Sequence, residues 1–414
     1  MKFGVFYELQ YPKPWTAGGE AALFRQALEQ IELADRLGYD HAWAVEHHFL
    51  DEYSHCSAPE VFLAAAAART RRIRIGHGIR QVIPNYNHPA RTAEGLATLD
   101  ILSDGRLDFG IGEGATRLEL GGFGIDAKQK RALALEAAEQ IADMMVLEPY
   151  PGFAGKGFSM PCRNVLPKPV QKPHPPMWMA CTNRDTIKVA ASLGVGALAF
   201  AFVDPDEARR WAEIYYGVIK SEQCVPIGHS VNANVAVVSA FSVHADRAEA
   251  IRRGQEGFEF FAYAINALVA EDSVPGRSRL WEKFQAKRGG HAHAPIAALE
   301  VSHRSAGIGT PEEMRRHLHE LEAVGVDQVI FLQQAGKNRH DHICQSLELF
   351  ARAVMPEFAA AAATRETRKQ AELAPYIAAA LARKPKRAPL AEDAIPLVKA
   401  SVARAQVDQS RAAQ

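Results

Sequence analysis

The chain alternates short apolar runs with longer segments whose apolar residues recur every three or four positions. The short runs have the length of strands, and the longer segments have the period of helices. Strands are predicted over residues 2–7, 41–45, 72–83, 106–112, 177–181, 196–202, 232–240 and 326–334. Helices are predicted over residues 20–37, 58–70, 89–102, 127–147, 184–193, 204–221, from 310 onward, and over about 341–354.

Eight strand–helix units predict an α/β fold of the (β/α)8 barrel type with insertions. A doubly wound parallel sheet alternates in the same way and is the second interpretation, but eight regular units favour closure. In such a barrel the chemistry lies at the carboxyl ends of the strands. Three short sequences fall at such ends, namely EHH at 46–48, GEG at 112–114 and CTN at 181–183.

Two segments depart from the repeating pattern. Residues 241–309 separate the seventh strand from its helix. We expect a lid-like insertion over the active end, because long loops in compact domains are usually functional; a surface elaboration is the alternative. Residues 357–414 are rich in Ala, Lys and Arg. They are predicted to extend a barrel of residues 1–356, as a partly disordered helical tail or as a helical arm that packs on a second subunit.

Charge and composition narrow the class of protein. Lys+Arg and Asp+Glu both number 48, so no basic excess indicates binding to nucleic acid or to an anionic membrane. We expect no transmembrane helix and no signal peptide, because no apolar run reaches the required length. The five cysteines are scattered and form no C-x-x-C pair. That pattern is typical of a reducing compartment, and we predict a cytoplasmic protein.

The adjacent His47 and His48 are the first candidates for chemistry. Neighbouring residues on a strand point to opposite faces, so one should face the barrel interior and the other should pack outward or toward a loop. A histidine at a strand end can exchange protons near neutral pH; a structural histidine is the alternative. Glu46 is a candidate to orient an imidazole or to pair with a buried arginine. No zinc-binding spacing appears, and we expect no catalytic metal.

Two glycine- and threonine-containing segments are candidates for cofactor binding. The sequence GIGEGA at 110–115 has the spacing of a dinucleotide fingerprint, but residues 116–126 are expected to form a loop where that fingerprint needs a helix. We attribute Gly112 and Gly114 to close approach of the backbone to a flat ring. Thr182 and Thr186 could hold a phosphate at a helix start. Ordinary capping by Thr182 or Asn183 is the alternative.

Taken together, these stretches resemble the bacterial luciferase-like flavin monooxygenases. The matching sequences are KFGVF (2–6), LADRLGYDHAWAVEHHF (33–49), IGHGIRQVIPNYNHPARTAEGLATLDILSDGRLDFGIGEG (75–114), FGI (123–125) and GVDQVIFLQ (325–333). The resemblance implies a barrel, usually a homodimer, that binds reduced FMN supplied by a separate flavin reductase. Reduced flavin and dioxygen then form a flavin hydroperoxide, which oxygenates a small or medium organic substrate where water is excluded.

The resemblance also implies roles for individual residues. His47 would be the catalytic acid/base, and Gly78–Ile79 matches a non-prolyl cis peptide beneath the flavin. Cofactor contacts are expected from Gly78, Ile79, Gly112, Gly114, Ala180, Cys181, Thr182 and Thr186, and substrate contacts from Phe6 and His48.

The chain also departs from luciferase. It has Gly112 and Glu113 where luciferase has a cysteine and an arginine, so Arg117 or Arg184 is expected to supply charge for the flavin phosphate. Two other functions remain open within the resemblance. One is hydride transfer with a deazaflavin coenzyme, and the other is flavin binding without catalysis.

Overall fold

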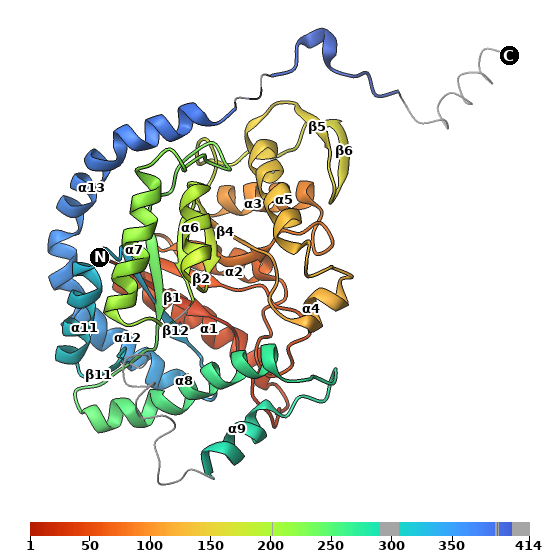
Figure 1. The fold of residues 1–414 in the computed structure, drawn as a ribbon. Coiled ribbons are helices and arrows are strands. Elements are labelled where there is room, and N and C mark those ends of the chain that lie inside the picture. The colour runs from red at the N-terminus through yellow and green to blue at the C-terminus, as the bar shows by residue number, and fades with distance from the viewer. Residues whose placement is uncertain (201, 290–305, 386, 388, 400–414) are drawn as a thin grey trace.

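The computed structural model describes residues 1–200, 202–289, 306–385, 387 and 389–399, and it shows a closed barrel of parallel strands (Figure 1). The spatial order is β1-β2-β3-β4-β7-β8-β9-β12, with β12 paired to β1. The strands are β1 (Lys2–Tyr7), β2 (His41–Ala44), β3 (Arg74–Gln81), β4 (Leu107–Gly112), β7 (Met177–Cys181), β8 (Gly196–Ala199), β9 (Val235–Ser239) and β12 (Gln328–Gln333). The predicted (β/α)8 barrel is confirmed, since a doubly wound sheet would leave two strands at open edges.

A helix follows each barrel strand and covers the outside of the barrel. In chain order these are α1 (Gly19–Leu37), α2 (Pro59–Arg69), α3 (Pro89–Leu102), α5 (Lys130–Val146), α6 (Arg184–Ser192), α7 (Pro205–Ile219), α11 (Pro311–Ala323) and α12 (His340–Ala353). Their limits follow from local sequence signals. Gly38 ends α1 with a φ of 90°, a conformation that glycine adopts readily. Thr310 and Glu313 cap the start of α11 reciprocally.

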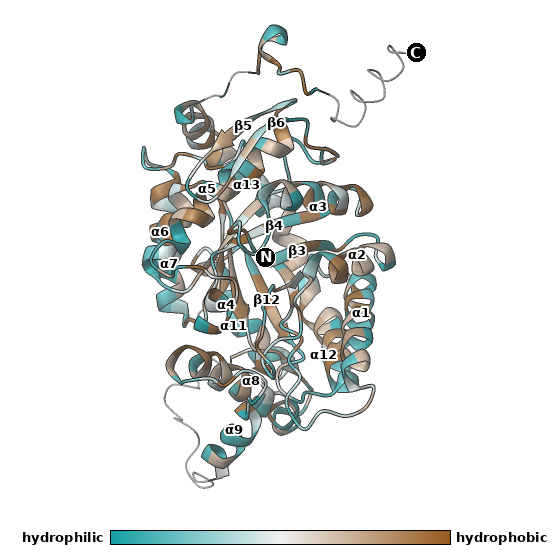
Figure 2. Cartoon of the chain, turned by 90° about the vertical axis from the view of Figure 1, so that its right-hand side faces the viewer, coloured by the Kyte–Doolittle hydropathy of each residue, from teal (hydrophilic) through white to brown (hydrophobic). Residues whose placement is uncertain are grey.

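Two tryptophans fill the barrel interior. Trp43 on β2 and Trp178 on β7 meet edge to face, with ring centroids 5.5 Å apart. A Cβ at Gly76 would overlap the Trp43 ring, and one at Gly196 would overlap the Trp178 ring. The two glycines therefore make room for the bulky side chains of neighbouring strands. Apolar colours accordingly mark the barrel strands, whereas the outward surfaces of α1 and α7 are polar (Figure 2).

Several predicted limits need correction. The predicted strands at 72–83, 196–202 and 232–240 are shorter in the structure, and Ala201 lies outside the described residues. The predicted loop at 116–126 contains a short helix, α4 (Arg117–Gly122), which Thr116 caps through its side chain. Helix α5 begins at Lys130 rather than near 127. An antiparallel hairpin of β5 (Tyr150–Ala154) and β6 (Ser159–Arg163) was not predicted.

The insertion between β9 and α11 lies at the carboxyl end of the barrel (Figure 1). It contains β10 (Ser242–Val243), α8 (Arg247–Ala270), α9 (Leu280–Gly289) and β11 (Ile308–Gly309), and its residues 290–305 lie outside the described part of the chain. The buried carboxylate of Glu52 accepts hydrogen bonds from the backbone N–H groups of Leu280 and Trp281. This contact ties the start of α9 to the loop after β2.

The C-terminal extension begins with one long helix, α13 (Met355–Arg383), which lies along the outside of the barrel beside α7 and α12 (Figure 1). The Lys369 ammonium pairs with Asp327 at 2.6 Å, and the Arg383 guanidinium donates to the carbonyl oxygen of Cys224. Helix α13 thus packs on its own barrel, whereas residues 391–399 beyond it are exposed. Contact with a second subunit stays a prediction, and residues 386, 388 and 400–414 lie outside the described chain.

Within the described ranges, no helix combines the length and the apolar character needed to cross a membrane.

Candidate active site

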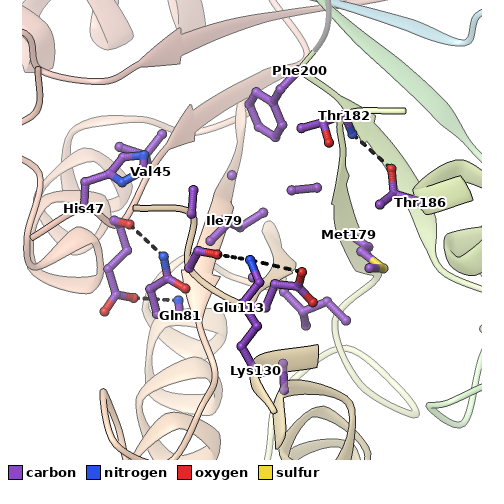
Figure 3. A pocket seen from close by; sticks show the side chains of 18 of the residues that line it. Val45, His47, Ile79, Gln81, Glu113, Lys130, Met179, Thr182, Thr186 and Phe200 are labelled. Atoms are coloured by element: carbon purple, nitrogen blue, oxygen red, sulfur yellow. Dashed lines mark hydrogen bonds and ion pairs between the residues drawn. The ribbon is translucent and has the colours of Figure 1, made fainter. Parts of the chain in front are cut away.

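A cavity of about 390 Å³ opens at the carboxyl ends of the barrel strands. Residues within or just after the carboxyl ends of β1, β2, β3, β4, β7 and β8 line it, and one face of α8 forms a further wall. Figure 3 shows His47 and Ile79 on one side of this cavity and Thr182 and Thr186 on the other. The location agrees with the general rule for barrel enzymes.

Most of the predicted site residues meet at this cavity, although three do not. The wall includes His47, Gly78, Ile79, Gly112, Gly114, Ala180, Thr182 and Thr186. The side chains of Phe6, His48 and Cys181 lie behind it. Segments far apart in sequence are therefore brought together as the barrel predicts. Cofactor or substrate contact by Phe6, His48 and Cys181 stays a prediction.

His47 stands just beyond the end of β2, where the alternation of a strand no longer applies. Its Nδ1 lies 2.9 Å from Oε1 of Glu119, and its Nε2 lies 3.7 Å from Oε2 of Glu8. Burial alone disfavours the imidazolium, but the charge and hydrogen bond of Glu119, together with Glu8, raise the pKa of His47 to about 9. The imidazole therefore carries a proton at neutral pH.

Glu119 reaches His47 from α4. Burial opposes ionisation of this carboxyl group, but His47 and the hydroxyl of Thr116 hold its pKa below the ordinary value. Thr116 donates to Oε2 of Glu119 at 2.8 Å, and the backbone N–H of His48 donates to Oε1 at 3.1 Å. Because these donors fix the carboxylate, Nδ1 of His47 stays bound and Nε2 is left for a reactant.

His48 points in another direction and is not a cavity residue. Its Nε2 lies 3.1 Å from Oε1 of Glu46, and its ring packs edge to face on Phe123 with centroids 4.9 Å apart. Glu46 also accepts from the backbone N–H of Gln81 and lies 3.8 Å from Arg80. Both roles considered for Glu46 are thus present, but the histidine it orients is His48 rather than His47.

Phe6 and Cys181 are also buried away from the wall. The Phe6 ring lies 5.3 Å from the ring of Phe200, which does line the cavity, so Phe6 supports the wall from behind. The Cys181 thiol contacts the carbonyl oxygens of Met179 and Thr186. Burial raises the pKa of Cys181 to about 12, which keeps it a neutral thiol that packs beneath the loop.

The peptide bond between Gly78 and Ile79 is cis, as the resemblance predicts. The packing of the protein gives a second explanation for Gly112. A Cβ on Gly112 would overlap Cδ1 of Ile79, so a larger residue there would displace the Ile79 side chain. Gly114 has a φ of 77°, a region that favours glycine. Contact of these glycines with a flat ring stays a prediction.

The start of α6 is capped by its own residues. Asn183 accepts from the backbone N–H of Thr186, and the hydroxyl oxygen of Thr186 accepts from the N–H groups of Thr182 and Asn183. The capping interpretation is therefore present, with Asn183 rather than Thr182 as the cap. Because Thr182 and Thr186 also line the cavity, phosphate binding remains compatible with this geometry.

Positive charge reaches the cavity from α5. Lys130 and Arg131 line the wall, and the Arg131 guanidinium binds Glu113 through two hydrogen bonds of 2.7 and 2.9 Å. The Lys130 ammonium donates to the carbonyl oxygen of Gly114 at 2.7 Å (Figure 3). Arg184, by contrast, pairs with Glu207 outside the cavity wall. Among the described residues of the wall, the lysine and arginine side chains are therefore those of Lys130 and Arg131.

Several residues at the wall or beside it were not predicted from the sequence. The apolar face of α8 contributes Phe261, Ile265 and Val269, whose spacing of four places them on one side of a helix. Thr116 and Glu119 have the spacing of a helix cap, a signal that would have revealed α4. Glu8 gave no sequence signal of its own. Among the described side chains, no group of three His, Cys, Asp or Glu residues is arranged to hold a metal ion.

Comparison with known proteins agrees with this architecture. The family model of the luciferase-like monooxygenases matches residues 1–328. The alkanal monooxygenase alpha chain of Photorhabdus laumondii is 24% identical over 362 residues, which cover 86% of this chain and 97% of that protein.

Two solved structures share the fold. The FMN-bound oxygenating constituent of 3,6-diketocamphane monooxygenase from Pseudomonas putida has a TM-score of 0.68 at 19% identity, covering 86% of this chain and 98% of that one. A secondary alcohol dehydrogenase that depends on coenzyme F420 has a TM-score of 0.65 at 16% identity, covering 85% and 98%. Both are similar in fold alone, whereas the family match extends over most of the sequence. The chain belongs to the luciferase-like monooxygenase family.

Proposed function

We propose that the protein is the oxygenase of a two-component flavin-dependent monooxygenase. It would use reduced FMN from a separate flavin reductase, together with dioxygen, to oxygenate a small or medium organic substrate. The observation that carries this proposal is His47, a protonated imidazole held by Glu119 at the wall of a cavity with many apolar side chains. Such a site controls a proton while restricting access of water.

The residues around the cavity fit a phosphorylated flavin. Lys130 and Arg131 provide positive charge, and Thr182 and Thr186 provide hydroxyl groups at a helix start. We assign the phosphate to these four residues. We assign the ring to the wall formed by Gly78, Ile79, Gly112, Gly114 and Ala180. Reduced FMN would supply the electrons that activate dioxygen, and the protein supplies orientation, proton control and exclusion of water.

The proposed substrate is apolar in the part that enters the cavity. Phe200, Met179 and the α8 face formed by Phe261, Ile265 and Val269 present aromatic and aliphatic surface. Burial of such surface favours an apolar ligand, while His47 and Glu8 offer polar groups near the reacting position.

Stopped-flow absorbance tests the proposed function. Anaerobic reduced FMN and protein are mixed with oxygenated buffer, and flavin reoxidation is followed in the wild type, in His47→Ala and in the surface control His319→Ala. We expect the wild type and the control to delay formation of oxidised flavin, and His47→Ala to shorten that delay by ~10²-fold or more. Reoxidation at the free-flavin rate in all three proteins would contradict FMN oxygenation.

The second candidate is a deazaflavin-dependent oxidoreductase that transfers hydride. The observation that keeps it open is Glu113, whose carboxylate neutralises part of the positive charge of Lys130 and Arg131 and so weakens the attraction for the doubly charged phosphate of FMN. Equilibrium titration of the protein with FMN and with the deazaflavin coenzyme, read by fluorescence, separates the two candidates. Tight binding of FMN without substrate turnover would indicate a third function, that of a flavin-binding protein.

We also propose that the protein is a cytoplasmic homodimer. Five unpaired cysteines suit a reducing compartment. Sedimentation equilibrium checks the assembly, with an expected mass of twice the 45.3 kDa chain. A single-chain mass across the micromolar range would contradict the dimer.

A further inference from the structure

Glu8 is a buried acidic residue to which the proposed function assigns no part in proton transfer. It follows β1, lines the cavity and is 3% exposed. Oε1 accepts a hydrogen bond of 3.0 Å from the Tyr53 hydroxyl. Oε2 finds no hydrogen-bond partner among the residues that the structure describes. The nearest nitrogen recorded for Oε2 is Nε2 of His47, at 3.7 Å.

This arrangement differs from that of a carboxylate buried for structural reasons. Both oxygens of the buried Glu52 accept hydrogen bonds, from backbone N–H groups and from the Ser278 hydroxyl. Burial of an unpaired carboxylate is costly, and structural carboxylates avoid that cost by complete hydrogen bonding. Glu8 has one oxygen satisfied and one directed beside the acid/base of the cavity. A protonated Glu8 relieves the cost, because a neutral carboxyl group is cheaper to bury than a charged one.

We propose that Glu8 is the proton reserve of His47, a positioning residue that acts through the imidazole rather than on the substrate. The reaction in which it serves rests on the proposed function. His47 gives its Nε2 proton to an oxygen of the bound reactant, so one N–H bond breaks and one O–H bond forms. Glu8 then transfers its carboxyl proton to Nε2 and remains as a carboxylate that the Tyr53 hydroxyl stabilises. A proton from solvent restores the neutral carboxyl group.

The distance between the two groups suits this role. A separation of 3.7 Å is longer than a hydrogen bond, so Glu8 does not occupy Nε2 in the resting protein. Nε2 stays available to a reactant, and a small rotation of the imidazole brings it to Glu8. Because Glu119 holds Nδ1, such a rotation is a pivot about a fixed hydrogen bond.

The surroundings of Glu8 favour a proton that is exchanged near neutral pH. Burial raises the pKa of Glu8 to about 7, against the opposing effects of His47 and the Tyr53 hydroxyl, and the charge of Glu119 raises it further. Burial raises the pKa values of the nearby Tyr53 hydroxyl and Cys56 thiol well above their ordinary values, so both stay neutral.

Other groups around the pair support its arrangement or add charge. Ser54 donates to the backbone carbonyl oxygen of Glu8 at 2.7 Å. Phe261 of α8 packs on Tyr53 with ring centroids 5.8 Å apart, which closes this side of the cavity with apolar surface. Glu46 acts on His47 by its charge alone.

Histidine NMR on the cofactor-free full-length protein tests the proposal without relying on turnover. The His47 ring signal is assigned by its loss in His47→Gln and is then followed from pH 5 to pH 10. We expect two steps in the wild type, a small one near pH 7 as Glu8 ionises and a large one near pH 9 as His47 does. In Glu8→Gln, which keeps an acceptor for Tyr53, the first step should disappear and the second should move to lower pH.

Two further variants separate a proton role from a merely structural one. Glu8→Asp should retain the first step with a smaller amplitude, since its carboxyl group lies farther from the imidazole. Tyr53→Phe removes a donor that stabilises the charged form, so the first step should move to higher pH. Two unchanged steps in Glu8→Gln, or a single step in the wild type, would overturn the proposal.

Turnover links the pair to the reaction. Once a substrate is found, kcat of Glu8→Gln should fall by ~10²-fold with KM little changed, and the acidic limb of its pH profile should shift. Equal losses in kcat at every pH would contradict a proton role. If the NMR steps appear as expected but FMN is not oxygenated, the proposed function fails while the Glu8–His47 pair stands.

Discussion

Nδ1 of His47 lies 2.9 Å from Oε1 of Glu119, although 72 positions separate the two residues along the chain. The loop after β2 provides the imidazole, and α4, beyond β4, provides the carboxylate. Thr116 caps α4 and also donates to Glu119, so the start of a short helix fixes the position of the charge. The cavity wall therefore contains a buried histidine, His47, that stays protonated.

The pairing of His47 with Glu119 makes the free energy of unfolding depend on pH in a defined direction. The pKa of His47 is about 9 in the folded chain, above the ordinary histidine value of about 6.5. Its stabilising contribution is therefore complete below about pH 6.5 and is lost as the pH rises through 9. In Glu119→Gln we expect this loss to shrink, because the pKa of His47 falls toward the ordinary value. Urea unfolding at pH 6 and pH 9.5 measures the change. Identical pH dependence in both proteins would contradict the role of Glu119.

Gly112→Ala should destabilise the barrel next to the cavity. The added Cβ overlaps the Ile79 side chain and lies 3.4 Å from the carbonyl oxygen of Arg80. Overpacking of this kind costs ~1–3 kcal/mol. Gly95→Ala is the matched control, since its Cβ meets nothing within 4 Å inside helix α3 and should stabilise by up to ~1 kcal/mol. Urea denaturation separates the two; a neutral Gly112→Ala would show that Ile79 yields freely.

Arg131→Gln should weaken FMN binding by about 10–100-fold, the effect of losing a charged hydrogen bond of ~1.5–3 kcal/mol. Riboflavin, which lacks the phosphate, should bind both proteins equally. Arg184→Gln is the control, because its guanidinium pairs with Glu207 outside the cavity wall. Fluorescence titration measures the affinity of the wild type and of each variant for FMN and for riboflavin. Weaker FMN binding in Arg184→Gln alone would instead support the cation expected from the sequence.

Glu52→Gln should loosen the insertion. Glu52 accepts from the N–H groups of Leu280 and Trp281, and the uncharged amide loses a charged acceptor at the start of α9. We expect a loss of ~2–3 kcal/mol and faster proteolysis after α8. Glu282→Gln, at an exposed pair with Arg279, is the control and should leave the protease pattern unchanged. Equal cleavage of Glu52→Gln and the wild type would show that other contacts hold the insertion.

The sequence by itself determined the barrel, because the patterns that distinguish strands from helices are formed by residues close together in the chain. Runs such as residues 2–7 and 326–334 have the length and composition of strands, and signals such as Gly38 and Thr310 mark where helices end and begin. The position of His47 at a strand's carboxyl end was also readable, since parallel closure brings all such ends to one face. The hairpin of β5 and β6 was not predicted, because apolar and polar residues alternate only weakly in its strands and because it is not part of the strand–helix repeat of the barrel.

Only the tertiary structure decided which side chains meet at that face. Glu8 follows β1 and Arg131 lies on α5, after β4, and no local pattern specifies that both line one cavity. Strand alternation did not say which of the adjacent histidines faces the cavity, although the resemblance indicated His47. Glu119 holds His47 at the cavity, while Glu46 and Phe123 hold His48 behind it. Hydrophobic period fixes which face of an element is buried, but the partner across the barrel depends on register, closure and the path of each loop.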